Sequence, residues 1–427
     1  MTLGRPIARC IASITRAAVL PALIAMATLV ACERPTAPAV LVYADRPLTL
    51  PSTASGWRSV SVGGGHSCGI RVDGQLACWG NGRNGQLGVG TPRGQCGRRL
   101  TACEGGPRYV NAALRFTKVS AGERHSCALT VDGALVCWGE SSQYQTGVEG
   151  AALVPTPTPV LPALRFVDVA AGSTHSCAVR TTGEVYCWGE GRLGALGRGD
   201  TVTSVIPRPI VSSERFVSVG SGRWRSCAIS IAGALWCWGA QWERSESGLD
   251  YFHERLVPMR VQNAPSSKQV SVSGSSICGV AVDAGAYCFE ANSFAQLGIG
   301  TTDGTLIPTM VASPEALVQV SAGIVQGCGL TARGAALCWG NDTFGQLGIP
   351  RTGEFCGVGQ LECRRSPAPV FGALRFLEVQ TGLGSHSCGV TVQGAIACWG
   401  LGGDGQLGDG WTRDRQSLPV GVLAPVR

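Results

Sequence analysis

Cysteine side chains are the reactive groups with the most regular spacing in this chain of 427 residues. Seven couples recur about every fifty residues, each with its members ten residues apart. Such thiols can form disulfides or bind zinc, but zinc sites favour ligands two to four residues apart, and no Cys-x-x-Cys occurs here. We therefore expect structural disulfides, with no metal site and no cofactor. The couples are Cys68 with Cys78, Cys127 with Cys137, Cys177 with Cys187, Cys227 with Cys237, Cys278 with Cys288, Cys328 with Cys338, and Cys388 with Cys398.

The N-terminal segment predicts export. Arg5, Arg9 and Arg16 precede an apolar run over residues 17–30, which is short for a membrane span and typical of a secretory signal. The run ends in Leu29-Val30-Ala31-Cys32, which resembles the bacterial lipobox. This resemblance implies cleavage before Cys32 and lipid attachment to its sulfur, and an ordinary signal peptide cut nearby is the alternative. The expected location is the bacterial cell envelope, on its periplasmic or surface side, with the lipid as the only membrane contact.

Export makes a full set of disulfides plausible, because they persist in oxidising compartments. Of the 20 cysteines, Cys10 leaves with the signal and Cys32 carries the lipid. Two couples seven residues apart then complete the set: Cys96 with Cys103 and Cys356 with Cys363. These couples lie in extra segments near residues 91–109 and 350–366, which we expect to be loops that a disulfide closes.

The chain divides into three parts by composition. Residues 1–31 read as the lipoprotein signal peptide. Residues 32–55 are rich in proline and read as a tether. Residues 56–427 hold the repeats and are expected to fold as one domain.

Within each repeat, the couple spaced by ten predicts a β-hairpin. If Val131, Asp132 and Gly133 form a three-residue loop with Gly133 left-handed, Thr130 faces Ala134 and the two cysteines of that repeat fall opposite each other. Directly opposed residues lie close enough for a disulfide. The fifth repeat has its glycine one place later, at Gly285, so its turn is expected to differ.

Each repeat has room for four strands. In the third copy we expect them at residues 166–172, 175–179, 185–189 and 207–211. Radial repetition of four-stranded sheets is the propeller arrangement, and both faces of each hairpin are apolar, as in a sheet buried between neighbouring blades. The predicted fold is all-β: a seven-bladed β-propeller of four-stranded antiparallel blades, stapled by disulfides.

The repeat resembles the regulator of chromosome condensation repeat family. The matching motifs include Ala121-Gly122, His125-Ser126, Asp132-Gly133 and Trp138-Gly139, and the Gly-Gln-Leu-Gly segment that begins at Gly85, Gly345 and Gly405. The resemblance covers nearly all of residues 56–425 and implies a seven-bladed propeller closed by pairing the two ends of the chain. Its eukaryotic founder is a guanine nucleotide exchange factor for a nuclear GTPase, and exported bacterial relatives include an inhibitor of β-lactamases.

Two apparent catalytic signals have a structural explanation in the repeat. The segment Gly65-His66-Ser67-Cys68-Gly69 matches Gly-x-Ser-x-Gly, whose chemistry needs an exposed serine at a strand-to-helix elbow. The next repeat has a strand at the same place, so we interpret the match as coincidence. Four histidines share one repeat position, which separates them into different blades and favours structural hydrogen bonds over a metal site: His66, His125, His175 and His386.

The fourth and fifth repeats depart from the rule and are the best candidates for function. The fourth has Arg225 where others have histidine, lacks Gly-Gln-Leu-Gly and is rich in tryptophan, tyrosine and arginine, the residue types that dominate binding hot spots. The fifth has Phe289-Glu290 in place of Trp-Gly. Drift in one copy of a redundant array is the alternative. The candidate interaction residues are Arg223, Trp224, Arg225, Trp242, Tyr251, Phe252 and His253.

Binding is the function class that the sequence favours, and no catalytic residues are expected. The formal net charge of +7 includes three arginines of the signal, so nucleic acid is not an expected partner. We expect a non-catalytic propeller that presents a loop-bearing rim to an unidentified protein, with a glycan as the alternative ligand. The second hypothesis is an extracytoplasmic carbohydrate-binding or polysaccharide-cleaving propeller enzyme. Nucleotide exchange activity ranks last, because an exported chain does not meet a cytoplasmic GTPase.

Overall fold

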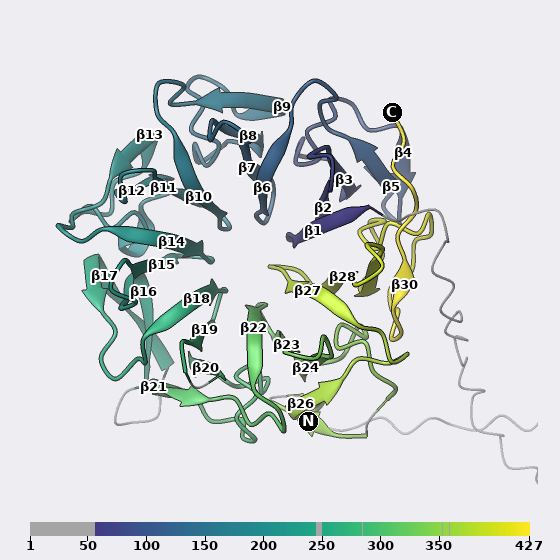
Figure 1. Ribbon diagram of the computed structural model, residues 1–427. Helices are drawn as coiled ribbons and strands as arrows, with labels where there is room; N and C mark the ends of the chain where they lie inside the picture. The colour runs from purple at the N-terminus through teal and green to yellow at the C-terminus, as the bar shows by residue number, and fades with distance from the viewer. Residues whose placement is uncertain (1–55, 245–249, 284, 352, 358) are drawn as a thin grey trace, which may run out of the picture. The chain divides into compact units, whose positions relative to one another are not determined.

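The computed structural model describes residues 56–427 except 245–249, 284, 352 and 358, and in this part the chain forms a ring of seven antiparallel sheets (Figure 1). The predicted seven-bladed propeller is confirmed. Each blade is one contiguous stretch of chain, with its first strand at the centre of the ring and its last at the outside (Figure 1). The predicted signal peptide, Cys32 and tether lie outside the described residues.

The first four blades take up the N-terminal half of the ring. Blade one has β1 (Trp57–Val62), β2 (His66–Arg71), β3 (Leu76–Asn81) and β5 (Thr101–Tyr109), with the added β4 (Gly94–Cys96); blade two has β6 (Phe116–Ala121), β7 (His125–Thr130), β8 (Leu135–Glu140) and β9 (Leu153–Val160). Blade three has β10 (Phe166–Ala171), β11 (His175–Arg180), β12 (Val185–Gly189) and β13 (Ser204–Pro209), with the 3₁₀ turn η1 (Arg192–Gly194). Blade four has β14 (Phe216–Ser221), β15 (Arg225–Ser230), β16 (Leu235–Arg244) and β17 (Asp250–Arg260).

The last three blades complete the ring. Blade five has β18 (Ser267–Val272), β19 (Ser276–Ala281), β20 (Gly285–Glu290) and β21 (Thr305–Met310). Blade six has β22 (Leu317–Ala322), β23 (Gln326–Thr331), β24 (Ala336–Asn341) and β26 (Leu361–Pro369), with the added β25 (Phe355–Cys356). Blade seven has β27 (Phe376–Thr381), β28 (His386–Thr391), β29 (Ile396–Gly400) and β30 (Val420–Gly421). Among the described residues, no helix is long and apolar enough to cross a membrane.

The central hairpin of each blade has the predicted register. In the second blade the Thr130 amide donates to the Ala134 carbonyl, Gly133 has φ +78°, and Cys127 lies opposite Cys137. All seven couples spaced by ten are disulfides with α-carbons 4.0–4.1 Å apart, and both couples spaced by seven are disulfides as well. In the fifth blade Ala281 lies opposite Gly285 in the same register, but the left-handed glycine is Gly285, with φ +80°, one place later than in the second blade, so its turn differs as expected.

The outermost strand of the third blade begins earlier than predicted, at Ser204 instead of residue 207. The reason is a register shift: Cys187 pairs with Arg208 and Gly189 with Ser204, so residues 205–207 of β13 lie opposite Trp188 alone, which has no partner on β13. Gly189 has φ +99°, a conformation that favours glycine. Trp188 keeps its ladder partner Ser176 on β11, and its indole contacts the neighbouring blade.

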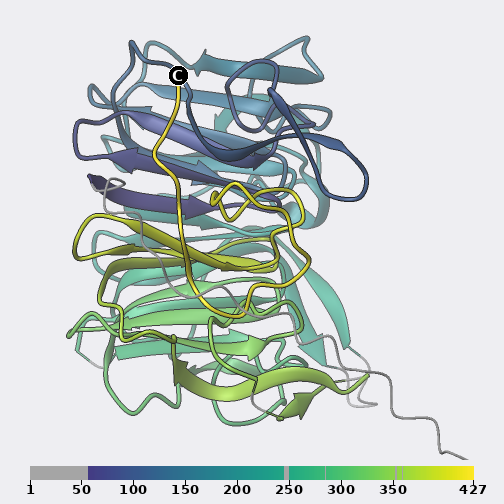
Figure 2. The same cartoon turned by 90° about the vertical axis from the view of Figure 1, so that its right-hand side faces the viewer.

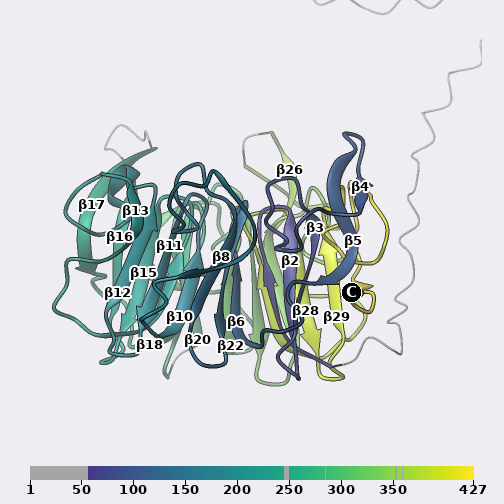
Figure 3. The ribbon, with the colours of Figure 1, turned by 90° about the horizontal axis from the view of Figure 1, so that it is seen from above.

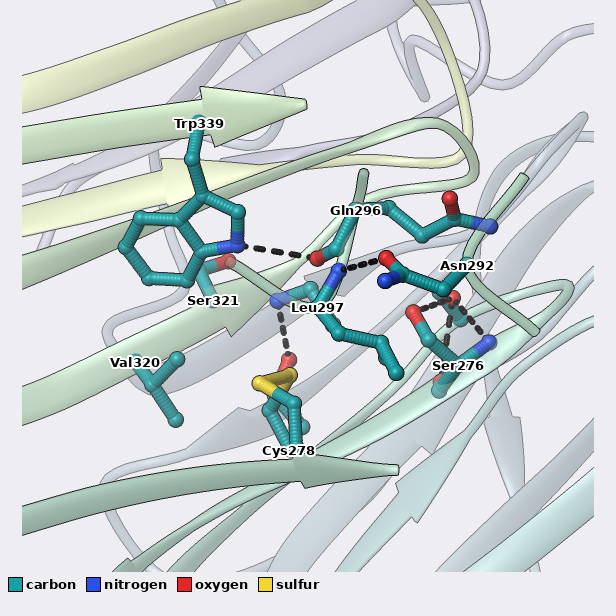
Figure 4. The surroundings of a disulfide bond; sticks show 12 residues. Ser276, Cys278, Asn292, Gln296, Leu297, Val320, Ser321 and Trp339 are labelled. Carbon is teal, nitrogen blue, oxygen red and sulfur yellow. Dashed lines mark hydrogen bonds between the residues drawn. A yellow bond between two sulfur atoms is a disulfide. The ribbon is translucent and has the colours of Figure 1, made fainter. Parts of the chain in front are cut away.

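That contact joins adjacent blades around most of the ring. The indole N–H of Trp339 donates to the backbone carbonyl of Gln296 in the preceding blade at 2.9 Å, beside the Cys278–Cys288 disulfide (Figure 4). We call this hydrogen bond the indole latch. It recurs at six of the seven interfaces, with donor–acceptor distances of 2.9–3.0 Å, from Trp79 to Gln406, Trp138 to Gln86, Trp188 to Gln145, Trp238 to Ala195, Trp339 to Gln296 and Trp399 to Gln346.

The repeated histidines add a second contact at four of these interfaces. Ser126 donates its hydroxyl to the Gln86 carbonyl at 3.0 Å and lies 2.8 Å from His66 Nε2, so Nε2 carries the proton and donates to the serine. The same His–Ser contact joins His125 to Ser176, His175 to Ser226 and His386 to Ser67. The expected structural hydrogen-bonding role is therefore present in the geometry.

Burial keeps these imidazoles neutral. Desolvation lowers the pKa of His66, His125 and His386 to about 3 and that of His175 to about 4. A charged ring would sit in the blade interface without a counter-ion, and Nδ1 of all four has no hydrogen-bond partner.

The ring closes where the last blade meets the first. The Trp57 amide donates to the Gly394 carbonyl, and beyond β30 the chain crosses to the outer strand of the first blade, where Val426 forms a parallel bridge with Arg108. No blade mixes strands from the two ends of the chain within residues 56–427 apart from the gaps. The ends meet through this tail instead of through a shared sheet.

The neutral histidines predict acid sensitivity. Above pH 6.5 each imidazole is neutral in both the folded and the unfolded chain. Below pH 6.5 the histidines of the unfolded chain bind protons, whereas those of the folded chain stay neutral. The free energy of unfolding therefore falls as the pH falls toward about 4. We expect His125→Gln, which copies Gln326 of the sixth blade, to reduce the slope of stability against pH by up to about 1.4 kcal/mol per pH unit. Urea unfolding at pH 7.0, 5.5 and 4.5 measures both slopes, and equal slopes would contradict this role.

Candidate functional site at the interface of blades four and five

One interface lacks every part of the two contacts described above. Between blades four and five, Arg225 stands at the histidine position, Ile277 at the serine position and Phe289 at the tryptophan position. The turn whose backbone accepts the indole elsewhere, Gly-Gln-Leu-Gly or a variant of it, is replaced in blade four by the long hairpin of β16 and β17. The fourth and fifth repeats therefore meet at one altered interface, as adjacent irregular blades should.

A buried ion pair takes the place of the lost contacts. Glu290 occupies the position of the glycine in the Trp-Gly pair, with φ +85°, and its carboxylate contacts the Arg225 guanidinium of the preceding blade. Both side chains are at most 3% exposed. Burial lowers the pKa of Arg225 to about 9. Removing either side chain would therefore leave the other as an uncompensated buried charge, which costs free energy of folding.

The altered interface also contains a cavity of about 280 Å³. The indole and the leucine-bearing turn that fill the equivalent space elsewhere are missing here, and phenylalanine is smaller than the tryptophan it replaces. All four substituted residues line the cavity: Arg225, Ile277, Phe289 and Glu290.

The structure distributes the predicted interaction residues over three places. Arg225 lies inside the blade interface. Trp242 is also buried, with its ring close to Gly304 of blade five. His253 is exposed on β17; the side chains of Tyr251 and Phe252, on the same strand, lie outside the described residues.

Arg223 and Trp224 are separate from that hairpin. Arg223 is exposed and stacks on the half-buried Trp224, 4.3 Å from guanidinium carbon to ring centroid, and Arg192 lies 5.5 Å from the same ring. The two residues line a hollow of about 250 Å³ with Glu123, Arg124 and Glu140 of blade two. The exposed aromatic and basic groups thus lie toward blades two and three.

The two disulfide-closed inserts lie on the side of the ring from which the β16–β17 hairpin also projects (Figure 3). We call this side the loop face; it also carries Arg223 and Trp224, which follow β14. The blade-one insert contacts blade seven, with Arg98 Nη2 3.0 Å from Asp414 Oδ2. Figure 2 shows this insert and the C-terminal segment from the side.

The blade-six insert is held to blade seven by an arginine between two acids. Arg415 Nη1 lies 2.7 Å from Glu362 and Nη2 lies 3.6 Å from the buried Asp342. Desolvation raises the pKa of Asp342 to about 7, because the nearby Arg415 only partly offsets its burial. Among the described residues, Glu354, Cys356 and Cys363 form the group with metal-like spacing, but the two cysteines are joined as a disulfide and offer no thiolate.

Three buried groups that could do acid, base or nucleophile chemistry make contacts within the scaffold. Ser67 is fully buried on β2 and donates to the Gln406 carbonyl, so it does not sit at an exposed elbow. In the central channel, where a cavity of about 360 Å³ lies, Asp168 accepts the Val219 amide and Glu378 accepts the Val60 amide of the next blade. Desolvation raises the pKa of Glu378.

The family follows from a match to most of the ring. The RCC1-like domain description matches residues 93–426, and the regulator of chromosome condensation (RCC1) repeat matches residues 57–86. The chain belongs to the RCC1-like domain family. Together the two matches cover all seven blades, including the altered fourth and fifth.

Curated relatives of this family match only over short stretches. The probable E3 ubiquitin-protein ligase HERC3 of Homo sapiens is 35% identical over 91 residues, 21% of this chain and 8% of that protein. The mitochondrial RCC1 domain-containing protein RUG3 of Arabidopsis thaliana is 33% identical over 101 residues, 24% of this chain and 21% of that protein. The matched stretch thus spans less than a quarter of the length of either relative.

Two solved structures share the fold. Yeast RCC1 (Prp20), in its complex with Kap60, superposes with a TM-score of 0.70 at 20% identity and covers 81% of this chain and 83% of its own. Human WBSCR16 gives a TM-score of 0.63 at 22% identity, covering 79% of this chain and 87% of its own. At these identities the likeness establishes the propeller architecture.

The Arg225–Glu290 pair predicts strong coupling. Glu290→Gly removes the carboxylate that Arg225 faces, so we expect the free energy of unfolding to fall by roughly 3–5 kcal/mol. Adding Arg225→His restores the residues of blades one to three at both positions and should recover at least half of that loss. Urea unfolding of the parent, both single variants and the double variant gives the coupling energy. Additive losses would contradict the pairing.

Proposed function

We propose that the protein is an exported, lipid-anchored, non-catalytic propeller that binds a protein partner on its loop face. The observation that carries this proposal is the grouping of Trp224, Arg223 and Arg192 on one exposed surface. Tryptophan and arginine dominate protein-binding hot spots, and the stacked geometry lets the cations and the ring present one amphipathic surface.

The hollow next to this stack supports a protein ligand. Its wall combines the acids Glu123 and Glu140 with Arg124, so it offers both charges to a partner of mixed polarity. The two inserts limit the loop face on its other side, and their disulfides reduce the entropy that a loop loses on binding.

The family supports the same class of function. The solved complex of yeast RCC1 contains Kap60, and a second structure of Prp20p from Saccharomyces cerevisiae is described with its binding to Gsp1p and histones. Those partners belong to those proteins. For this chain we carry over the use of the propeller as a protein-binding scaffold.

Nine disulfides support export, because such bonds are typical of proteins outside the cytoplasm. A lipid on Cys32 and the tether of residues 32–55 would hold the ring at a membrane surface of the cell envelope. A ring held in this way meets partners by diffusion in two dimensions or from the adjoining solution.

The anchor is tested by metabolic labelling. In a bacterial host supplied with labelled palmitate, the parent should incorporate label and remain in the membrane fraction, whereas Cys32→Ser should incorporate none. Cys10→Ser is the matched control and should be labelled like the parent, because Cys10 lies in the expected signal. Label in Cys32→Ser would overturn the anchor.

The loop face is tested by comparative capture from the native cell envelope. The parent and Trp411→Ala, which removes an exposed tryptophan from the blade-seven loop, should capture the same protein. The double variant Arg223→Ala, Trp224→Ala should capture at least fivefold less, because it removes the stack. Quantitative mass spectrometry of the captured proteins gives the ratio. Equal capture by all three would contradict a binding surface at Trp224, and retention of glycan alone would favour the carbohydrate-binding alternative.

A further inference from the structure

The cavity between blades four and five has a defined structural origin. It lies where six other interfaces place an indole ring against the turn of the preceding blade, and where this chain has Phe289 and no such turn. Its volume of about 280 Å³ is near the lower end of the range for small-molecule sites. The space is therefore enough for a compact organic molecule of about one aromatic ring and a short chain.

Part of the cavity wall is apolar. Trp238, Ile277 and Phe289 line it, and each is at most 4% exposed. The Arg225–Glu290 pair also lines the cavity, and its two charges face each other. Arg255 lines it as a further cation. The apolar side chains favour the apolar body of a ligand, and the cations favour an anionic group.

The outer part of the cavity differs in chemistry. Met259, Leu306 and Ile307 are large apolar side chains that are 45–62% exposed on the outermost strands β17 and β21. Arg260 lies beside Met259 on the same strand and is exposed. Exposed apolar side chains around a cavity of mixed lining, with a cation next to them, match a ligand that is apolar at one end and anionic at the other.

A further polar group faces the cavity without a partner. The Oε1 atom of Gln241 is buried, and no described residue donates a hydrogen bond to it. An unpaired buried acceptor carries a desolvation cost, which a ligand N–H or O–H at this place would remove. This atom is independent of the missing latch, since Gln241 belongs to the hairpin that replaces the turn.

We propose that this cavity binds a small organic carboxylate with an aromatic or branched apolar body. The body lies against Phe289, Ile277 and Trp238, and the carboxylate lies at the outer end, next to Arg260. A hydroxyl or amide N–H on the ligand donates to Gln241. This site is separate from the protein-binding surface proposed above, which lies on the loop face toward blades two and three, so either can fail without the other.

The test uses 3-phenylpropanoate as the probe and 3-phenylpropan-1-amine as the probe of the same shape and opposite charge. Saturation-transfer NMR on the folded, oxidised protein measures binding of each. We expect the carboxylate to bind at least fivefold more tightly than the amine, because the cation at the outer end attracts one and repels the other. No binding of the carboxylate, or equal binding of the two probes, would overturn the proposal.

Two variants locate the site. Phe289→Trp restores the residue of the six other blades and fills the cavity, so it should reduce probe affinity at least tenfold while the melting temperature stays the same or rises. Arg260→Gln should reduce affinity at least threefold, and Arg208→Gln, an exposed arginine on the outer strand of blade three, should leave it unchanged. Unchanged binding to Phe289→Trp would show that the probe binds elsewhere and would overturn the assignment. A variant that unfolds is replaced by Phe289→Leu, which enlarges the cavity and should retain the preference for the carboxylate.

Discussion

The ring depends on a hydrogen bond from an indole to a backbone carbonyl in the neighbouring blade. A blade is a sheet whose two faces are both buried, so its neighbours hold it mainly through non-directional apolar contact. The indole latch adds direction, because a hydrogen bond joins one indole N–H to one carbonyl. At four interfaces a serine hydroxyl contacts the adjacent histidine, and in three of them it donates to the same carbonyl as the indole.

Replacing the latch changes more than one property of an interface. Where Arg225 and Glu290 stand in for neutral groups, the contact between blades becomes an ion pair whose members cannot be exchanged one at a time. The same replacement removes a large side chain and a turn, which leaves a cavity. A structural redundancy of seven similar interfaces thus lets one of them diverge while the other six keep the ring closed.

The fold could be predicted from the sequence because the constraints are local and repeated. A spacing of ten between cysteines, with Gly133 and its equivalents at one place, determines a hairpin and its register. The departures of blades four and five were visible too. The pairing of Arg225 with Glu290 was not, since it joins residues of different repeats. Knowing that His66 reaches Ser126, one repeat later, would have placed Arg225 against the next blade, but not against Glu290, which holds the glycine position. The inward orientation of Trp242 follows from packing against Gly304, which no local pattern records.

All nine disulfides join cysteines that are nearest neighbours in the order of the chain, from Cys68–Cys78 to Cys388–Cys398. No bond encloses another, and none crosses from one blade to the next. An oxidant that joins neighbouring thiols along residues 56–427 therefore makes the native set, and a bond-shuffling enzyme has nothing to correct. The covalent link of each blade needs no residue of a later blade. A protein with so many disulfides thus needs only simple oxidation to complete them.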